Sequence, residues 1–213
     1  MVRKIAAEIS DEELESDLKR YRKRAIELGA TDAKVISSDF IIIDERVRAK
    51  CIYPKCASYG TNAHCPPYAM EIEDVRKLVD KYKSGIFIDL RVPSDVVAGP
   101  RVAELGLNIP SGLKMHEIVA KIEAEAFFDG YHLALGFALG ACKMFYCSDQ
   151  ECSALIQGQG CRHPLRARAS MEGMGMNVYT MAAKAGWDIY PIGQRTKPED
   201  VHCGHRFGLV LMT

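Results

Sequence analysis

The spacing of apolar residues along the chain predicts alternating helices and strands. An S-x-x-E capping box at Ser10 precedes an apolar face with helical spacing, which predicts a helix that ends at Gly29. Similar helical patterns occur at residues 71–85, 113–130 and 177–186. Short apolar runs predict strands at residues 33–37, 40–43 (extended by 45–50), 86–92, 131–140, 187–192 and 207–212.

The order of these predicted elements repeats. A helix, a strand, a cysteine-rich loop, a second helix and a second strand occur twice, and residues 93–112, with three prolines and three glycines, connect the two series. The pattern predicts the α/β class, as a layered α/β sandwich, with three layers favoured over an all-helical or all-β fold. We expect a single domain over residues 1–213, built from two related halves at about 1–95 and 112–213.

Composition and charge exclude some classes of function. The chain is 48% hydrophobic and 26% charged, with 28 basic and 28 acidic residues. This balance provides no overall field for nucleic acid or an acidic membrane, so neither is an expected partner. The N-terminus has no apolar signal segment, which predicts a cytoplasmic protein whose thiols are reduced. The eight cysteines are therefore candidate metal ligands or redox groups rather than disulfides.

The cysteines follow a repeated spacing. The pattern C-x4-C-x8-C occurs twice in the chain, and a further cysteine precedes its second copy by the same four-residue step. The first cysteine set is Cys51, Cys56 and Cys65, and the second cysteine set is Cys142, Cys147, Cys152 and Cys161. Cys203 stands alone. Because isolated buried thiols have no reason to repeat a two-interval spacing, the repeat indicates that each set acts together.

Both zinc and iron–sulfur clusters use cysteine ligands. Structural zinc sites usually contain cysteine pairs separated by two to four residues. The chain has no C-x2-C pair, and its C-x4-C steps leave zinc open as an alternative. Iron–sulfur clusters are larger than one ion, and proline often follows a ligand cysteine, as Pro66 follows Cys65 here. Glycines at 60, 140, 158 and 160 would let backbone N–H groups approach such a cluster. An iron–sulfur cluster is therefore favoured over zinc.

The number of cysteines leads to two hypotheses about function. The second cysteine set completes the ligands of one [4Fe–4S] cluster, and Cys203 would complete those of another with the first set. Two clusters predict electron transfer with a redox partner protein. Alternatively, an open iron at the first set would make the protein a cluster-based enzyme. A zinc-stabilised interaction module is the third possibility.

Other polar side chains surround the cysteines. Four candidate cofactor-binding residues follow the second set: Arg162, His163, Arg166 and Arg168. They could donate hydrogen bonds to a cluster or balance its negative charge. His202 and His205 flank Cys203 and could form a small metal or proton-relay patch.

Two strings carry a resemblance to a known family. The stretches KCIYPKCASYGTNAHCPP and GCRHPLRARASMEGMGMNV resemble the predicted metal-binding proteins of anaerobic bacteria and archaea, and the likeness extends over about residues 30–190. The resemblance implies a metal, in particular an iron–sulfur cluster, and little about the reaction. Met174 stands where the family pattern M-E-A-C-G has a cysteine, so the role of that cysteine does not extend to this chain.

Overall fold

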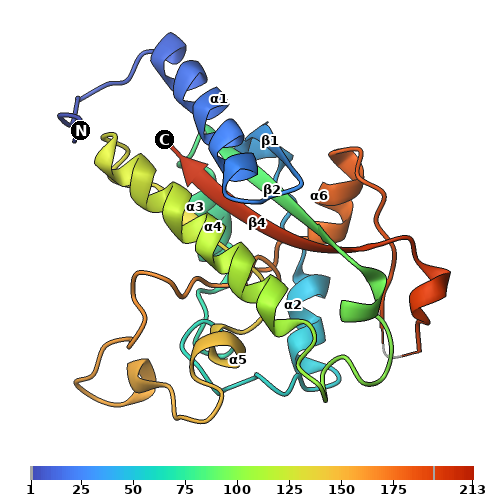
Figure 1. Ribbon diagram of the computed structural model, residues 1–213. Helices are drawn as coiled ribbons and strands as arrows, with labels where there is room; N and C mark the ends of the chain where they lie inside the picture. Colours follow the sequence, from blue (N-terminus) through green and yellow to red (C-terminus); the bar gives the residue numbers. More distant parts are fainter. Residues whose placement is uncertain (1, 194) are drawn as a thin grey trace.

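A computed structural model describes residues 2–193 and 195–213 and has a four-stranded antiparallel sheet at its centre (Figure 1). Its strands, in the order β1-β2-β4-β3, are β1 (Asp32–Ser37), β2 (Ser84–Val92), β3 (Leu135–Phe137) and β4 (Gly204–Met212). The helices are α1 (Asp11–Glu27), α2 (Glu45–Ile52), α3 (Ile72–Val79), α4 (Ile109–Phe128), α5 (Cys142–Tyr146) and α6 (Val178–Lys184). The fold therefore combines helices and sheet, as predicted. Within the described residues, no helix is long and apolar enough to span a membrane.

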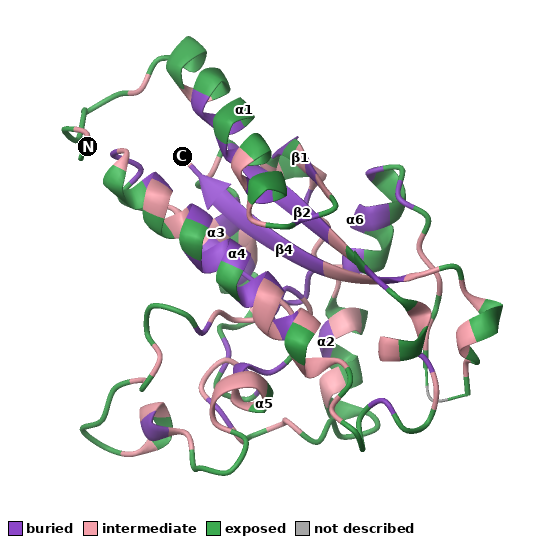
Figure 2. Ribbon diagram, viewed as in Figure 1, coloured by how far each residue is buried: buried purple, intermediate pink, exposed green. Residues whose placement is uncertain are grey.

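Alternating side chains of the central strands build two cores. Ile86 and Ile88 of β2 pack with apolar residues of α1 and α4, whereas Phe87 packs with residues of α3 and α6. Because neighbouring side chains of a strand point to opposite faces, the sheet lies between two layers of helices. Figure 2 shows β2 and β4 buried along most of their length, while α1 exposes its outer face.

The helix α4 lies very close to the sheet. An added Cβ at Gly208 would be 2.5 Å from Cγ2 of Val119 and 2.6 Å from Sδ of Met115. Gly136 of β3 is equally confined, since its Cβ would be 2.7 Å from Cγ1 of Val119. The missing side chains of these two glycines allow α4 to pack against β3 and β4.

We expect Gly208→Ala to lower the free energy of unfolding by about 1–3 kcal/mol, because the added methyl group overpacks the contact with α4. Chemical denaturation of the variant and the wild type measures this difference. Gly160→Ala is a matched control, because a Cβ at Gly160 would have no neighbouring atom within 4 Å. Equal stability of the two variants would contradict the close packing of α4.

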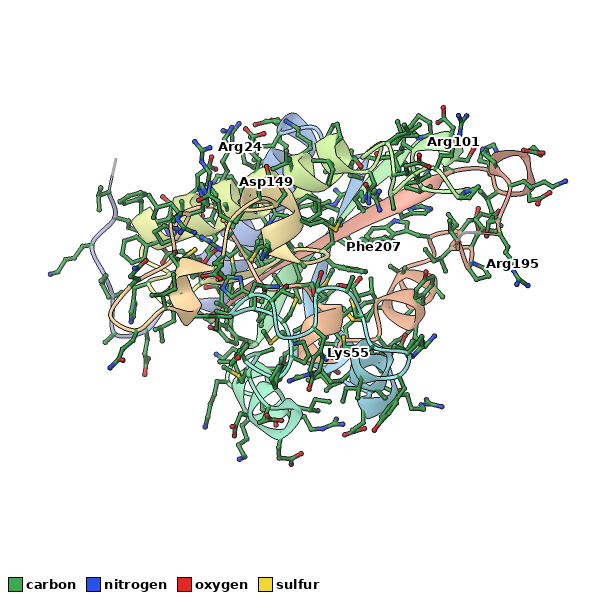
Figure 3. All side chains as sticks on the ribbon, turned by 90° about the horizontal axis from the view of Figure 1, so that it is seen from below. Arg24, Lys55, Arg101, Asp149, Arg195 and Phe207 are labelled. Atoms are coloured by element: carbon green, nitrogen blue, oxygen red, sulfur yellow. The ribbon has the colours of Figure 1, made fainter. Side chains whose placement is uncertain are left out.

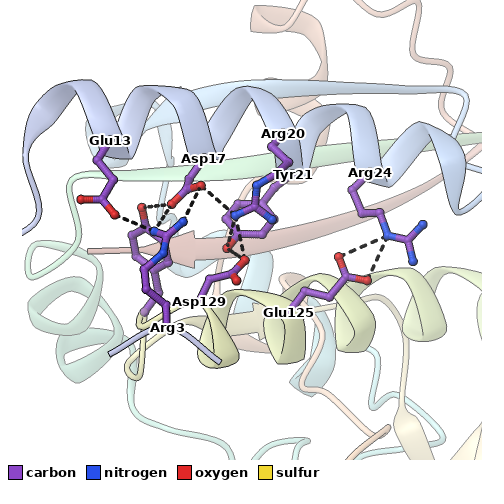
Figure 4. Close-up of polar contacts among 9 residues, drawn as sticks. Arg3, Glu13, Asp17, Arg20, Tyr21, Arg24, Glu125 and Asp129 are labelled. Carbon is purple, nitrogen blue, oxygen red and sulfur yellow. Dashed lines mark hydrogen bonds and ion pairs between the residues drawn. The ribbon is translucent and has the colours of Figure 1, made fainter. Parts of the chain in front are cut away.

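A polar network fastens α1 to α4 and to the N-terminal segment (Figure 4). Asp17 is buried and accepts hydrogen bonds from Arg3 at 2.6 Å, Arg20 at 2.7 Å and the hydroxyl of Tyr131 at 2.8 Å. Burial by itself would raise the pKa of Asp17, but these donors outweigh it and hold the pKa below its usual value. The network fixes the helix layer that carries none of the cysteines.

Three strand predictions were wrong. Residues 45–50 belong to α2, because the side chain of Asp44 caps that helix by accepting a hydrogen bond from the backbone N–H of Arg46. Residues 40–43 contain only the end of a 3-10 turn and an isolated bridge to Met176. Residues 187–192, all within the described part of the chain, form no strand. Their apolar side chains, such as Trp187, pack in the core without strand pairing.

The order of elements places both cysteine-rich segments at one end of the sheet. The series α1-β1-α2-α3-β2 is followed by α4-β3-α5-α6-β4. One cysteine-rich segment follows β1 and the other follows β3, and Figure 1 shows both below the sheet. A common origin of the two halves stays a prediction.

Candidate metal centre

The second cysteine set surrounds a small cavity of about 20 Å³. The residues that line it include Cys142, Cys147, Cys152 and Cys161. Cys142 begins α5, and the other three cysteines lie in the segment that follows this short helix. Local hydrogen bonds shape the segment, such as the one that the hydroxyl of Ser153 donates to the carbonyl of Gly160 at 2.7 Å. Four thiols from one segment therefore face a shared space that has room for little more than one water molecule.

The first cysteine set is assembled by the end of α2 and the loop after it. Cys51 lies in the last turn of α2, and the backbone N–H of Cys56 donates to the carbonyl of Cys51 at 3.0 Å. Gly60, at a φ of +73°, donates its N–H to the carbonyl of Pro66 at 2.8 Å and so closes the loop around Cys65. Burial raises the pKa of Cys51, and the nearby charges of Cys56 and Cys65 raise it further. The three thiols are thus neighbours.

Asn62 joins the two cysteine sets. Its side chain is fully buried, and its Oδ1 accepts a hydrogen bond from the thiol of Cys142 at 3.8 Å and one from the backbone N–H of His64 at 3.1 Å. The backbone N–H of Cys65 donates to the carbonyl of Asn62 at 3.3 Å, and the side chain of Asn62 lowers the pKa of the Cys65 thiol, although burial raises it overall. Sequence reasoning overlooked Asn62. The available signal was an Asn in a Gly- and Pro-containing loop, where its side chain typically bonds the backbone two residues later.

The cysteine sulfur atoms of the two sets are ligands that suit a thiophilic metal. Burial, with the charges of neighbouring cysteines, raises the pKa of Cys142 to about 12. A thiol in this position stays protonated unless a metal replaces the proton, so metal binding must release protons. Sulfur donors favour zinc or iron–sulfur clusters over hard cations. Among the described residues, no three histidine, cysteine or acidic side chains converge closely enough to hold a single ion, so either group requires the loops to adjust.

The four candidate cofactor-binding residues have different surroundings. The backbone N–H of His163 donates to Sγ of Cys161 at 3.3 Å, and its ring stacks on Tyr146 at 5.3 Å. Arg162 lines the cavity and donates to the carbonyl of Glu151 at 2.7 Å. Arg168 instead pairs with Glu123 of α4. The fourth residue, Arg166, is exposed. A role of these residues toward a cofactor stays a prediction, for which His163 and Arg162 are the better placed.

Among the described residues, the neighbours of Cys203 are not the cysteines of the first set. It directly precedes β4, and its Sγ lies 3.5 Å from Nε2 of His205. The charged groups that influence its pKa are Arg91, Asp89 and Asp188, with no cysteine among these described residues. Closure of the first cysteine set by Cys203 stays a prediction that these contacts do not support.

Comparisons with known proteins agree with a metal centre. Neither the curated proteins nor the solved structures contain a match to the chain. A family described as predicted metal-binding protein (DUF2284) does match, over residues 34–212. This range contains both cysteine sets, Asn62 and the whole sheet apart from the first two residues of β1. The chain therefore belongs to this family of predicted metal-binding proteins.

Proposed function

We propose that the protein binds iron–sulfur clusters at its two cysteine sets and transfers electrons to or from a redox partner protein. The observation that carries the proposal is the gathering of four cysteines around one cavity, since four thiolates are the ligand set of a [4Fe–4S] cluster. A bound cluster would supply a reversible one-electron couple. The cavity would have to widen to admit it, which the segment after α5 permits because its regular structure up to Cys161 is a single short 3-10 helix, Ser153–Leu155.

The surrounding residues would tune and protect such a cluster. The N–H of His163 that donates to Sγ of Cys161 would raise the reduction potential by stabilising negative charge on the sulfur. Tyr146 also lines the cavity, so it would help to exclude water. Asn62 holds the two cysteine sets next to each other, which favours electron exchange between them.

A second candidate function is a cluster-based enzyme. The observation that favours it is the first cysteine set, which has only three thiols, of which Cys56 is exposed, while Cys203 has different neighbours. An iron without a fourth thiolate can bind a substrate atom as a Lewis acid. Cys56, which is exposed, would lie where a substrate could approach.

Anaerobic analysis of iron, acid-labile sulfide and zinc, followed by a redox titration monitored by EPR, tests the proposal. We expect about four irons and four sulfides for each occupied set and a reversible couple. Fewer than about four irons per chain would refute the two-cluster hypothesis, and a colourless protein that contains only zinc would refute iron–sulfur binding altogether. EPR changes that depend on an added small molecule would favour the enzyme over the electron carrier.

A further inference from the structure

A cysteine, a histidine and an aspartate outside the two cysteine sets form a connected series. Sγ of Cys203 lies 3.5 Å from Nε2 of His205, and Nδ1 of the same ring lies 2.8 Å from Oδ1 of Asp89. The antiparallel register pairs Asp89 with Phe207, so Asp89 and His205 are diagonal neighbours on one face of the sheet. Chain segments more than a hundred residues apart therefore meet at this imidazole.

The ring of His205 is held in one orientation. It stacks on Phe207 with a centroid distance of 5.5 Å, and Phe207 stacks on Trp187 at 5.7 Å. Phe207 lies on β4 in the middle of the molecule (Figure 3). The side chains of Asp89 and His205 are 0% and 2% exposed. Because Asp89 accepts the Nδ1–H hydrogen bond, Nε2 is left as a proton acceptor that faces the sulfur.

A cavity adjoins this series. His205 and Phe207 line a hollow of about 210 Å³ together with apolar and aromatic side chains, such as Val97 and Tyr190, and with two charged residues, Glu172 and Arg206. Its volume is below the range of about 300–1,000 Å³ that is usual for drug-sized ligands. The cavity therefore suits a small molecule that has both polar and apolar parts, as an ester or thioester has.

We propose that Cys203 is a nucleophile, with His205 as its general base and Asp89 as a positioning residue, and that it accepts the acyl group of a small ester or thioester bound beside His205. This inference does not depend on the metal. The order thiol, imidazole, carboxylate is the arrangement that activates sulfur for acyl transfer.

The proposed reaction has two balanced steps. The thiol proton of Cys203 moves to Nε2 of His205, sulfur attacks the carbonyl carbon, and the leaving alcohol or thiol departs with that proton. Water then cleaves the new thioester, giving a proton to His205, which returns it to the sulfur. Nε2 of His205, 3.5 Å from Sγ of Cys203, is placed to accept the thiol proton as the sulfur attacks.

The test uses the full-length protein as purified, with its metal, and p-nitrophenyl acetate as the probe. We expect a burst of p-nitrophenolate of about one per chain, with acetylation at Cys203 identified by peptide mass spectrometry. Cys203→Ser should abolish the burst, and His205→Gln and Asp89→Asn should each slow it at least about tenfold. His132→Gln is the matched control, because His132 is an exposed histidine that does not line this cavity, and it should leave the rate unchanged.

Several outcomes would overturn the proposal. Acetylation spread evenly over the cysteines of the wild type would do so without any variant, even if a variant failed to fold. A burst that His205→Gln leaves unchanged would also contradict it. Loss of bound iron in Cys203→Ser would identify Cys203 as a ligand of the first cysteine set instead. A burst at Cys203 in a protein that binds no iron would refute the metal proposal alone.

Discussion

Cys152→Ala is expected to remove the iron bound by the second cysteine set and to leave that of the first. Cys152 lines the cavity that the second set surrounds, whereas the first set belongs to the end of α2 and the loop after it. A [4Fe–4S] cluster that loses one of four thiolates is held weakly, so about half of the iron and sulfide should be lost. Iron and sulfide analysis, together with EPR of the reduced protein, measures the loss.

The reciprocal variant separates the two cysteine sets. Cys56→Ala should remove only the iron of the first set, and the double variant should bind none. Ser148→Ala is a matched control in the second segment, since its side chain is exposed and lies one residue after Cys147. If Cys152→Ala lost all the iron or none of it, two independent clusters would be excluded. Lys55 and Asp149 mark the two segments in Figure 3.

Cys65 and Cys142 would be poor choices for this experiment. The thiol of Cys142 and the backbone N–H of Cys65 both donate to Asn62, and the charge of Cys65 contributes to the raised pKa of Cys142. A change at either one disturbs the contact between the two sets, so iron could be lost from both. The comparison between Cys142→Ala and Cys152→Ala therefore measures how strongly Asn62 couples the sets.

Local patterns predicted much of the fold. The helix α1 begins where the capping box placed it, with the backbone N–H of Glu13 donating to Oγ of Ser10 at 3.2 Å. Gly29, at a φ of +106°, follows the end of the same helix. The helix α4 was predicted from the helical spacing of its apolar residues, and the strands β2 and β4 from short continuous apolar runs, which are buried on both faces of the sheet. The repeated cysteine spacing located both candidate metal-binding segments.

Segments without an apolar period and contacts between distant parts of the chain could not be predicted in this way. The segment 45–50 is rich in charged residues and has no apolar period, so only the side chain of Asp44 indicated a helix. The meeting of the two cysteine sets at Asn62 joins residues that are 80 positions apart. The hydrogen bond from His205 to Asp89 spans 116 positions and depends on the pairing of β2 with β4. Contacts between residues so far apart in the chain leave no periodic pattern in the sequence.

A buried histidine makes the packing of α5 against α4 sensitive to acid. His116 of α4 is fully buried, and its Nε2 lies 3.0 Å from the carbonyl of Leu139, just before α5. Its ring packs against Phe145 at 5.0 Å and Tyr146 at 5.6 Å, both on α5. Burial lowers the pKa of His116 to about 4. The neutral imidazole therefore holds in place the helix that carries Cys142.

We expect the free energy of unfolding to fall as the pH is lowered from about 6.5 to about 4, by up to about 3 kcal/mol from His116. Above pH 6.5, His116 is neutral in both states and contributes no pH dependence. Below pH 6.5, His116 binds a proton in the unfolded chain but stays neutral in the folded protein, so the free energy of unfolding falls. Denaturant titrations at several pH values measure this slope.

His116→Gln should remove that part of the slope, because an amide can still donate to Leu139 but does not titrate. His132→Gln changes an exposed histidine and should keep the slope of the wild type. Protonation of metal-bound thiolates also destabilises the loaded protein in acid, but it affects both variants equally. If His116→Gln kept the full pH dependence, the imidazole would not be the group that holds α5 against α4.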